Sequence, residues 1–247
     1  MISVVIPYME RLAQGQGNEK ELKYAIRSFE KYCDFDFNIV LVGDCPSWYK
    51  GDFIPTQAIR GMQFARCFDI ANKLNHICNS PIITDDFIYS YDDIYLINKC
   101  TIDDFKKIVA LGIANRHSVS KDGSENYKRL FAQTIKDLDK DELYIYETHL
   151  PRILNKEKLS LIYRAYNLRQ RPILFSTIYF NEFFDYPDEI LMEKNTIKLG
   201  IYQQLPKSEI ERQVKDYKFL NHTEKSYGIG MQNFLKEKYK NKSRFEK

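Results

Sequence analysis

The segment FIYSYDDIYL, residues 87–96, is the most informative part of this chain. A β-branched and aromatic run reaches two adjacent carboxylates, Asp92 and Asp93, and then becomes apolar again. Such a run predicts a buried strand. Two carboxylates at the mouth of a parallel sheet provide the hard oxygen ligands that a divalent cation prefers, and such cations bridge nucleotide phosphates. The alternative is a solvated junction between strand and loop.

The segments before it alternate between strand and helix patterns. Apolar runs predict strands at residues 2–7, ended by Pro7, and at residues 37–44. The spacing of apolar residues predicts helices at residues 18–33, capped by Asn18, and at residues 61–79. A strand, a helix and a second strand in this order form a right-handed βαβ unit. The sequence therefore predicts an α/β fold with a mostly parallel, Rossmann-type sheet flanked by helices.

The ends of these strands collect polar side chains. Pro7 and Tyr8 close the first strand, Asp44 closes the second, and Asp92 with Asp93 closes the third. Ligands of open α/β sheets bind outside the carboxyl ends of the strands. We therefore expect a nucleotide to bind at this edge, with Asp44 near the nucleoside and the acid pair at a metal ion.

Arginines nearby in the sequence suit bidentate contact with phosphate. Arg27 lies on the first predicted helix, and Arg60 and Arg66 lie around the next one. A solvated helix face is the alternative for each of them.

His149 has the most site-like setting of the four histidines. It follows a strand-like run at residues 143–146 and precedes Pro151 and Arg152. An imidazole there suits a general base or a metal ligand. A surface or packing role is the alternative. The other acid pairs have simpler explanations, since residues 103–104 fall in the first turn of a predicted helix and residues 85–86 precede the strand.

Composition narrows the class of protein. The chain has 247 residues, 44% of them hydrophobic and 29% charged, as expected of one globular domain. We divide it into a donor-binding half, residues 1–97, and a less regular acceptor-binding half, residues 98–247, within one domain. A net charge of +3 is too small to indicate nucleic-acid binding by itself.

Cysteine usage and the absence of targeting segments predict a cytoplasmic protein. The five cysteines are odd in number, far apart and without CxxC spacing, which indicates reduced thiols. No signal peptide and no transmembrane run is visible, so any contact with a membrane would be peripheral. The motifs of dehydrogenases, P-loop kinases, zinc proteases and serine hydrolases are missing.

The end of the chain is basic. Residues 228–247 predict a helix and a tail that carries Lys236, Lys238, Lys240 and Lys242. These lysines suit an anionic partner such as a nucleic acid, a teichoic-type polymer or a membrane lipid. A solvated helix end is the alternative.

The first half of the chain resembles the opening half of GT-A fold glycosyltransferases, in residues 2–7, 25–28 and 40–44 and in the strand that ends in Asp92 and Asp93. Those enzymes transfer sugar from a nucleotide-sugar donor and usually hold Mn²⁺ or Mg²⁺ at an acidic motif. The chain is also similar to the Stealth family of sugar-1-phosphate transferases, which share that fold. The segments that carry this second resemblance occur in the family's order and are ELKYAIRSFEKY at residues 21–32, FIYSYDD at residues 87–93, HLPR at residues 149–152, FLN at residues 219–221 and KSRFE at residues 242–246.

The resemblance implies roles for individual residues. Arg27 would contact donor phosphate, Asp92 and Asp93 would bind the metal, His149 would be catalytic and Asn221 would line the site. We group Arg152 and Asp93 with His149 as catalytic residues, and Arg66 with the phosphate clamp.

Two departures from the Stealth pattern favour transfer of the sugar itself. The first strand reads VIPY at residues 5–8 in place of the family's threonine-tryptophan-valine-aspartate-glycine block, and His222 stands where an acid usually follows the asparagine. We therefore expect a metal-dependent glycosyltransferase acting on a glycan or other polymer. The alternatives are a Stealth-type sugar-1-phosphate transferase in surface polysaccharide synthesis and a non-catalytic glycan- or nucleotide-binding module.

Overall fold

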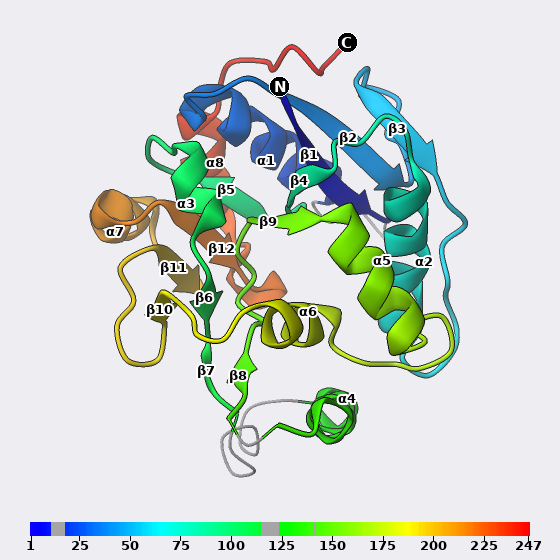
Figure 1. The fold of residues 1–247 in the computed structure, drawn as a ribbon. Coiled ribbons are helices and arrows are strands. Elements are labelled where there is room, and N and C mark those ends of the chain that lie inside the picture. Colours follow the sequence, from blue (N-terminus) through cyan, green and yellow to red (C-terminus); the bar gives the residue numbers. More distant parts are fainter. Residues whose placement is uncertain (11–17, 115–123, 141) are drawn as a thin grey trace.

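A five-stranded sheet with the order β3–β2–β1–β4–β9 organises the fold (Figure 1). The computed structural model describes residues 1–10, 18–114, 124–140 and 142–247. Strands β1 to β4 run parallel, and β9 pairs antiparallel with β4. The bounds of these strands are β1 Ile2–Tyr8, β2 Phe37–Gly43, β3 Asp52–Pro55, β4 Asp86–Tyr89 and β9 Arg152–Asn155.

Helices cover both faces of this sheet because its strands are apolar on both sides. On one face, alternate residues of β1 and β2 pack against α1, which is Asn18–Tyr32. On the other face, the intervening residues pack against α2, Ala65–Asn79, and α5, Lys156–Ala165. Strands buried on both faces read as continuous apolar runs, as residues 2–7 and 37–43 do.

A three-stranded sheet, β11–β12–β5, extends the fold beyond β4. It packs with α1, α7 and α8 around a third apolar cluster. The remaining elements in chain order are β5 Ile94–Leu96, α3 Ile102–Lys106, β6 Val109–Ala110, β7 Gly112–Ile113, α4 Glu125–Leu138, β8 Tyr144–Ile145, α6 Phe175–Phe183, β10 Glu189–Ile190, β11 Lys198–Ile201, α7 Lys207–Gln213, the 3-10 turn η1 Val214–Asp216, β12 Phe219–His222, the 3-10 turn η2 Glu224–Ser226 and α8 Ile229–Lys238.

The C-terminal residues are packed against the first half of the chain. Phe245 and Glu246 are buried, and the backbone of this segment bonds to that of residues 48–50. Lys238 lies over the rings of Tyr32 and Phe234. The tail expected after the last helix is therefore an ordered part of the fold, although Lys236, Lys240 and Lys242 are exposed.

The predicted fold class is confirmed, with a parallel-rich sheet between flanking helices. Several elements differ from the prediction. The run at residues 87–96 forms two strands, β4 and β5, which belong to different sheets. Strand β3 and strand β9 were not predicted. The helix predicted to contain residues 103–104 in its first turn is α3, which ends at Lys106 and is followed by β6. Residues 117–126, whose polar sequence predicts a loop or lid, lie mostly outside the described residues.

The first strand passes through Pro7 instead of ending there. The ladder with β4 stops at Val5, so at Pro7 the strand pairs only with β2. A proline without an N–H is tolerated where one side of a strand has no partner.

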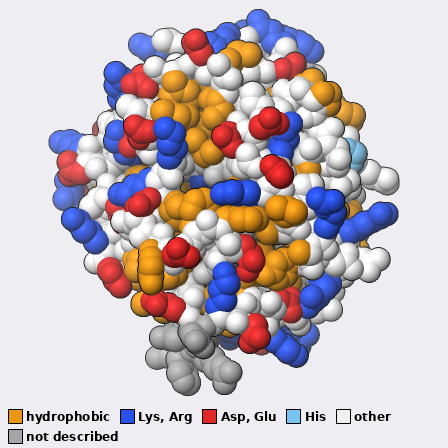
Figure 2. Space-filling view, in the orientation of Figure 1, with side chains coloured by type: hydrophobic (Ala, Val, Ile, Leu, Met, Phe, Trp, Pro, Cys, Tyr) orange, Lys and Arg blue, Asp and Glu red, His pale blue; other side chains and the backbone are white. Residues whose placement is uncertain are grey.

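One face of the molecule carries charges of both signs. On the face shown in Figure 2, acidic and basic side chains are interspersed around apolar patches. Among the described helices, none combines the length and the apolar character needed to cross a bilayer.

Candidate active site

The carboxyl ends of β1 and β2 meet at one edge of the sheet. Tyr8 pairs with Gly43, and Asp44 follows at once. Gly43 has φ +126°, and a Cβ there would lie 2.0 Å from the carbonyl oxygen of Tyr8, so this junction requires glycine. The Oδ2 atom of Asp44 accepts a hydrogen bond from the Glu10 amide at 2.7 Å and lies 3.9 Å from the Arg60 guanidinium. This polar rim lies where we expected the nucleoside.

The acid pair lies in the turn that leads from β4 to β5. Tyr89 ends β4 and Ile94 begins β5, so Asp92 and Asp93 cross from the main sheet to the smaller one. Both side chains are half-buried. A change of sheet explains why an apolar run is interrupted by acids, because the chain must leave one ladder before it enters the next.

His149 lies against this turn. Its ring stacks on that of Tyr91, with ring centroids 5.1 Å apart and planes at 25°. The backbone of His149 has φ +47°, a left-handed conformation that non-glycine residues rarely adopt. Such strained positions are concentrated at functional sites. His149 is exposed to water at the pocket that it lines, although the protein packed around its ring still removes part of its hydration.

Burial is the main reason that the pKa of His149 lies below its ordinary value of 6.5. The carboxylate of Asp93 opposes this shift, whereas the positive charges of Lys198, Arg152 and Arg66 reinforce it. These charges therefore lie close enough to act on one imidazole, which stays neutral and basic at neutral pH.

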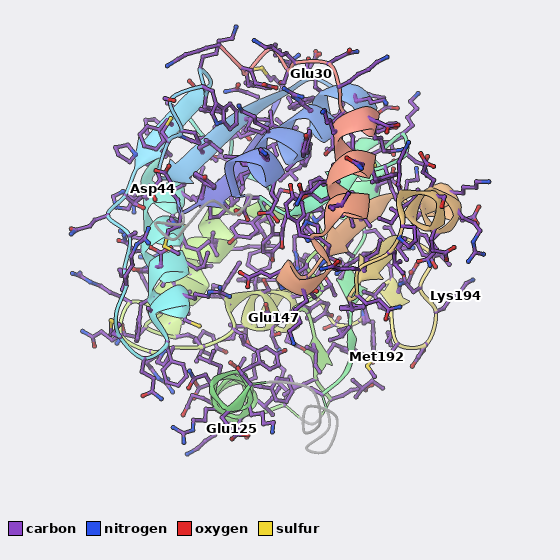
Figure 3. The ribbon with its side chains drawn as sticks, turned by 180° about the vertical axis from the view of Figure 1, so that it is seen from behind. Glu30, Asp44, Glu125, Glu147, Met192 and Lys194 are labelled. Carbon is purple, nitrogen blue, oxygen red and sulfur yellow. The ribbon has the colours of Figure 1, made fainter. Side chains whose placement is uncertain are left out.

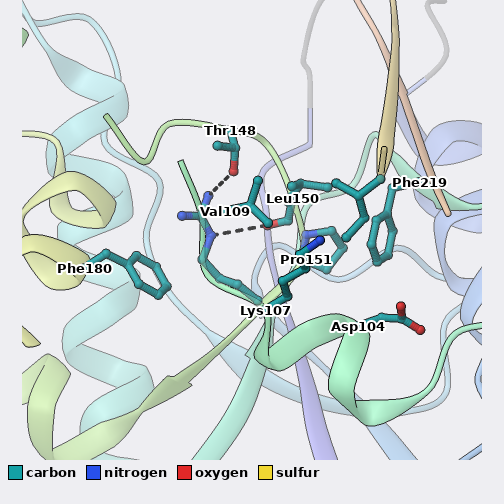
Figure 4. Close-up of a pocket in the computed structure, with 10 residues that line it drawn as sticks. Asp104, Lys107, Val109, Thr148, Leu150, Pro151, Phe180 and Phe219 are labelled. Carbon is teal, nitrogen blue, oxygen red and sulfur yellow. Dashed lines mark hydrogen bonds between the residues drawn. The ribbon is translucent and has the colours of Figure 1, made fainter. Parts of the chain in front are cut away.

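Arg152 supports the loop that carries His149. Its guanidinium donates to the carbonyl oxygen of Tyr146 at 2.7 Å. It also donates to the carbonyl oxygen of Leu150 at 3.3 Å and to the Thr148 hydroxyl at 3.2 Å, and these two bonds are drawn in Figure 4. It also lies over the ring of Phe180, and the side chain is buried. Because all these bonds are to its own loop, we interpret Arg152 as a positioning residue.

Lys198, on β11, is a residue that our sequence analysis missed. Its ammonium is buried and donates a 2.5 Å hydrogen bond to the carbonyl oxygen of Thr148. Burial lowers its pKa to about 8, against the opposing effect of Asp93. The available signal was a lysine at an inward position of the apolar run at residues 197–201.

Glu147 is the second residue that was missed. Its Oε1 atom accepts hydrogen bonds from the amide and the hydroxyl of Thr177, both at 3.3 Å. Burial raises the pKa of this carboxyl, although the charge of Arg152 opposes the shift. Figure 3 shows Glu147 in the centre of the molecule, whereas Asp44 lies nearer α2. The signal was an acid directly after the aromatic strand at residues 143–146.

A pocket of about 970 Å³ opens beside these residues. Glu147, His149, Tyr89 and Tyr91 line it on the side of the acid pair. Arg66, at the start of α2, also lines it and is exposed. Within the part of the chain that the structure describes, Arg66 has no hydrogen bond or ion pair, so its guanidinium is available to an anion.

Asn221 lies beside the acid turn. In the register of β12 and β5 it pairs with Ile94, the residue that follows Asp93. Its Oδ1 atom is buried and has no hydrogen-bond partner among the described residues. A buried polar atom without a partner is uncommon and fits a position where a ligand group binds.

Arg27 does not join this group. Its guanidinium forms a bidentate ion pair with Glu246, at 2.6 and 2.7 Å, and donates to the carbonyl oxygen of Tyr239. The prediction that Arg27 clamps the donor phosphate is therefore replaced by a structural role, since its donors already have partners at the C-terminus.

The donor set for a metal ion is small. Among the residues that the structure describes, no three His, Cys, Asp or Glu side chains converge to form a metal site. Mg²⁺ commonly uses one or two carboxylates and takes its other ligands from phosphates and water. The oxygen donors of Asp92 and Asp93 fit that pattern when a diphosphate completes the shell.

Comparisons with known proteins find likenesses of structure only. No family model and no curated protein matches the chain. A glycosyltransferase involved in glycosylation of the major capsid of PBCV-1 has 13% identity and a TM-score of 0.49 over 97% of this chain and 98% of its own. The glycosyltransferase GlyE of Streptococcus pneumoniae TIGR4 has 12% identity and a TM-score of 0.40, and its apo form 13% and 0.38.

The chain matches 96% of its own length to GlyE but only 60% of the GlyE chain. The three solved structures named here are glycosyltransferases, and none of these comparisons shows the Stealth family. At TM-scores below 0.5 these likenesses carry no argument about activity, which depends on the site itself.

Proposed function

We propose that this chain is a glycosyltransferase that uses a nucleotide-sugar donor and a divalent cation. One observation carries the proposal. Asp93, His149 and Lys198 act electrostatically on one another beside a large pocket, next to the turn that leaves the parallel sheet. A carboxylate, a neutral base and buried positive charge are the groups that transfer from a diphosphate requires.

The residues divide the reaction between them. His149, neutral at pH 7, takes the proton of the acceptor hydroxyl. The hydroxyl oxygen then forms a bond to the anomeric carbon of the sugar, and the bond from that carbon to the diphosphate breaks, which releases a nucleoside diphosphate. Arg66 contacts the diphosphate, and the buried charge of Lys198 favours the negative charge that develops there.

A divalent ion, Mg²⁺ or Mn²⁺, would be held by Asp92 and Asp93 and would supply Lewis-acid stabilisation of the leaving diphosphate. Tyr8 and Asp44, with the backbone at Pro7, would bind the nucleoside at the edge of the sheet. An anionic acceptor that contacts the exposed lysines near the C-terminus stays a prediction. The proposed reaction at the site does not depend on it.

The test is a donor panel with product analysis. UDP-, GDP- and CMP-sugars are incubated with Mg²⁺ or Mn²⁺ and with sugar acceptors, and the released nucleotide is identified. From UDP- or GDP-sugars, sugar transfer releases a nucleoside diphosphate, whereas sugar-phosphate transfer releases a monophosphate. Metal-independent binding without turnover would indicate the non-catalytic module.

The role of the acid pair is tested by comparing the turnover of Asp93→Asn with that of the wild-type chain. We expect turnover to fall roughly 100-fold or more, since one charge of the metal site is lost. Asp85→Asn is the control, because this acid precedes β4 at the other end and its carboxylate is 92% exposed. Full activity in Asp93→Asn would refute the assignment of the site.

A further inference from the structure

The part of the pocket away from the acid pair is apolar. Side chains from the start of α2, from α4 and from the segment that enters α6 line it together, and they include Phe64, Ile70, Leu130, Leu174 and Phe175. We call this part the apolar chamber. It is continuous with the part lined by His149 and Glu147, so a ligand in it would reach the proposed base.

The charged groups in this region do not favour an ionic ligand. Arg171, on its wall, is paired with Asp137 at 2.7 Å. Glu147 is enclosed and already bonded to Thr177. The exposed cation without a partner among the described lining residues, Arg66, lies at the start of α2.

The donor does not account for the chamber. The proposed contacts of the nucleotide sugar are Asp44, the acid pair and Arg66, none of which is among the apolar side chains of the chamber. The whole pocket, at about 970 Å³, falls at the upper end of the range for small-molecule sites, which run from roughly 300 to 1,000 Å³. Space therefore exists for a second ligand with an apolar body.

We propose that the apolar chamber binds the aglycone of the acceptor, an alkyl or aryl group attached to the sugar or alcohol whose hydroxyl is glycosylated. This inference rests on the proposed function and specifies its acceptor. The aglycone lies among Ile70, Leu130 and Leu174, and the hydroxyl faces His149. Burial of the apolar group supplies the affinity. The sugar or alcohol at the other end of the acceptor fixes the position of the hydroxyl next to His149.

The test uses n-alkyl glucosides below their micelle concentration, with methyl, butyl, hexyl and octyl chains, and phenyl glucoside as the aryl arm. Acceptor kinetics and calorimetric binding are both measured on the full chain. We expect kcat/KM and affinity to rise about threefold to fourfold for each added methylene, until the chamber is filled. A higher affinity and kcat/KM for phenyl glucoside than for butyl glucoside would indicate an aryl aglycone, and the reverse order would indicate an alkyl aglycone.

The matched variants are Ile70→Asn, in the chamber, and Ile82→Asn, on an exposed loop where Ile82 is 46% accessible. We expect the ratio of octyl to methyl glucoside affinity to fall about tenfold or more in Ile70→Asn and to stay at the wild-type value in Ile82→Asn. The wild-type chain-length series needs no variant, so misfolding of Ile70→Asn cannot conceal the result.

The outcomes separate the inference from the proposed function. Donor turnover with equal use of methyl and octyl glucosides would overturn the chamber and leave the transferase. Chain-length-dependent binding that Ile70→Asn abolishes, without turnover of any donor, would support the chamber as an apolar site and refute the transferase.

Discussion

At the scale of single residues, the proposed reaction requires a neutral imidazole at His149. His149 is held in a strained backbone conformation against Tyr91, and burial together with three cations lowers its pKa. Asp93 partly offsets this effect. An imidazole whose pKa lies below 6.5 is mostly neutral at pH 7 and can accept a proton from a hydroxyl.

The first prediction concerns the pH dependence of turnover. Since the pKa of His149 is lowered, kcat/KM should rise from acidic pH and reach a plateau, with a midpoint below 6.5. His149→Gln should lower the rate by roughly 10² to 10⁴ and remove the acidic limb. Rates measured from pH 4.5 to 8 check this.

Glu147→Gln is the control, because Glu147 also lines the pocket and burial raises the pKa of its carboxyl above the ordinary value. If Glu147→Gln removed the acidic limb and His149→Gln kept it, Glu147 would be the base.

The second prediction concerns Lys198. Its pKa is about 8 in the folded chain against 10.5 for an exposed lysine, so the unfolded chain binds more protons between these values. Stability must therefore rise with pH in that window, by roughly 3 kcal/mol. Urea unfolding of wild type and Lys198→Met at pH 7 and pH 10.5 measures the difference. An identical pH dependence in both proteins would contradict the buried charge.

Some of these candidate residues could be selected from the sequence, because a polar side chain at the end of an apolar strand has few structural explanations. Asp93 and His149 were identified in this way. Lys198 and Glu147 were missed because their importance arises from burial among residues distant in sequence. A lysine on β11 meets the loop at Thr148 only in the folded chain.

At the scale of elements, sequence patterns predicted a helix or strand correctly where the pattern depends on that element alone. Asparagine is a preferred cap residue, and Asn155 caps α5, since its side chain accepts from the Lys158 amide at 3.1 Å. Strands β3 and β9 were missed because they lie at the two edges of the sheet and are short. Edge strands are only partly buried, so they lack the continuous apolar run of central strands.

The third prediction concerns the contact between α1 and the C-terminus. Arg27→Met leaves the carboxylate of Glu246 buried without its partner, which should cost about 3 kcal/mol of unfolding free energy. The pKa of Glu246 is lowered in the folded chain, so the pair stabilises at neutral pH and loses its effect as pH falls below the usual carboxyl range.

Chemical unfolding at pH 7 and pH 3 measures this loss, and Arg27→Met/Glu246→Leu is the matched double variant that removes both charges. The double variant should recover much of the lost stability. Nucleotide affinity in the folded single variant should equal that of wild type. A large loss of donor affinity at constant stability would instead restore Arg27 to the donor site.

At the scale of the whole molecule, two sheets share one site. The main sheet supplies Tyr8 and Asp44, the proposed nucleotide edge, and the smaller sheet supplies Lys198 and Asn221. The turn at Asp92 and Asp93 joins them. The α/β class followed from alternating patterns in the first half, whereas the arrangement of the second half depends on pairings between distant segments, such as β5 with β12, that no local pattern encodes.

The fourth prediction follows from this arrangement, because a ligand that spans both sheets must stabilise the whole fold. A nucleoside diphosphate with Mn²⁺ at 100 times its dissociation constant should add about 2.7 kcal/mol, which corresponds to a rise of roughly 5 to 10 °C in Tm. Nucleotide alone and Mn²⁺ alone should each give a smaller shift. In Asp93→Asn the shift caused by the combination should fall to that of nucleotide alone, whereas Asp85→Asn should behave as wild type. If the nucleotide shift were the same with and without Mn²⁺ in the wild-type chain, the acid turn would not hold a metal, and positive charge from Lys198 and Arg66 would have to replace it.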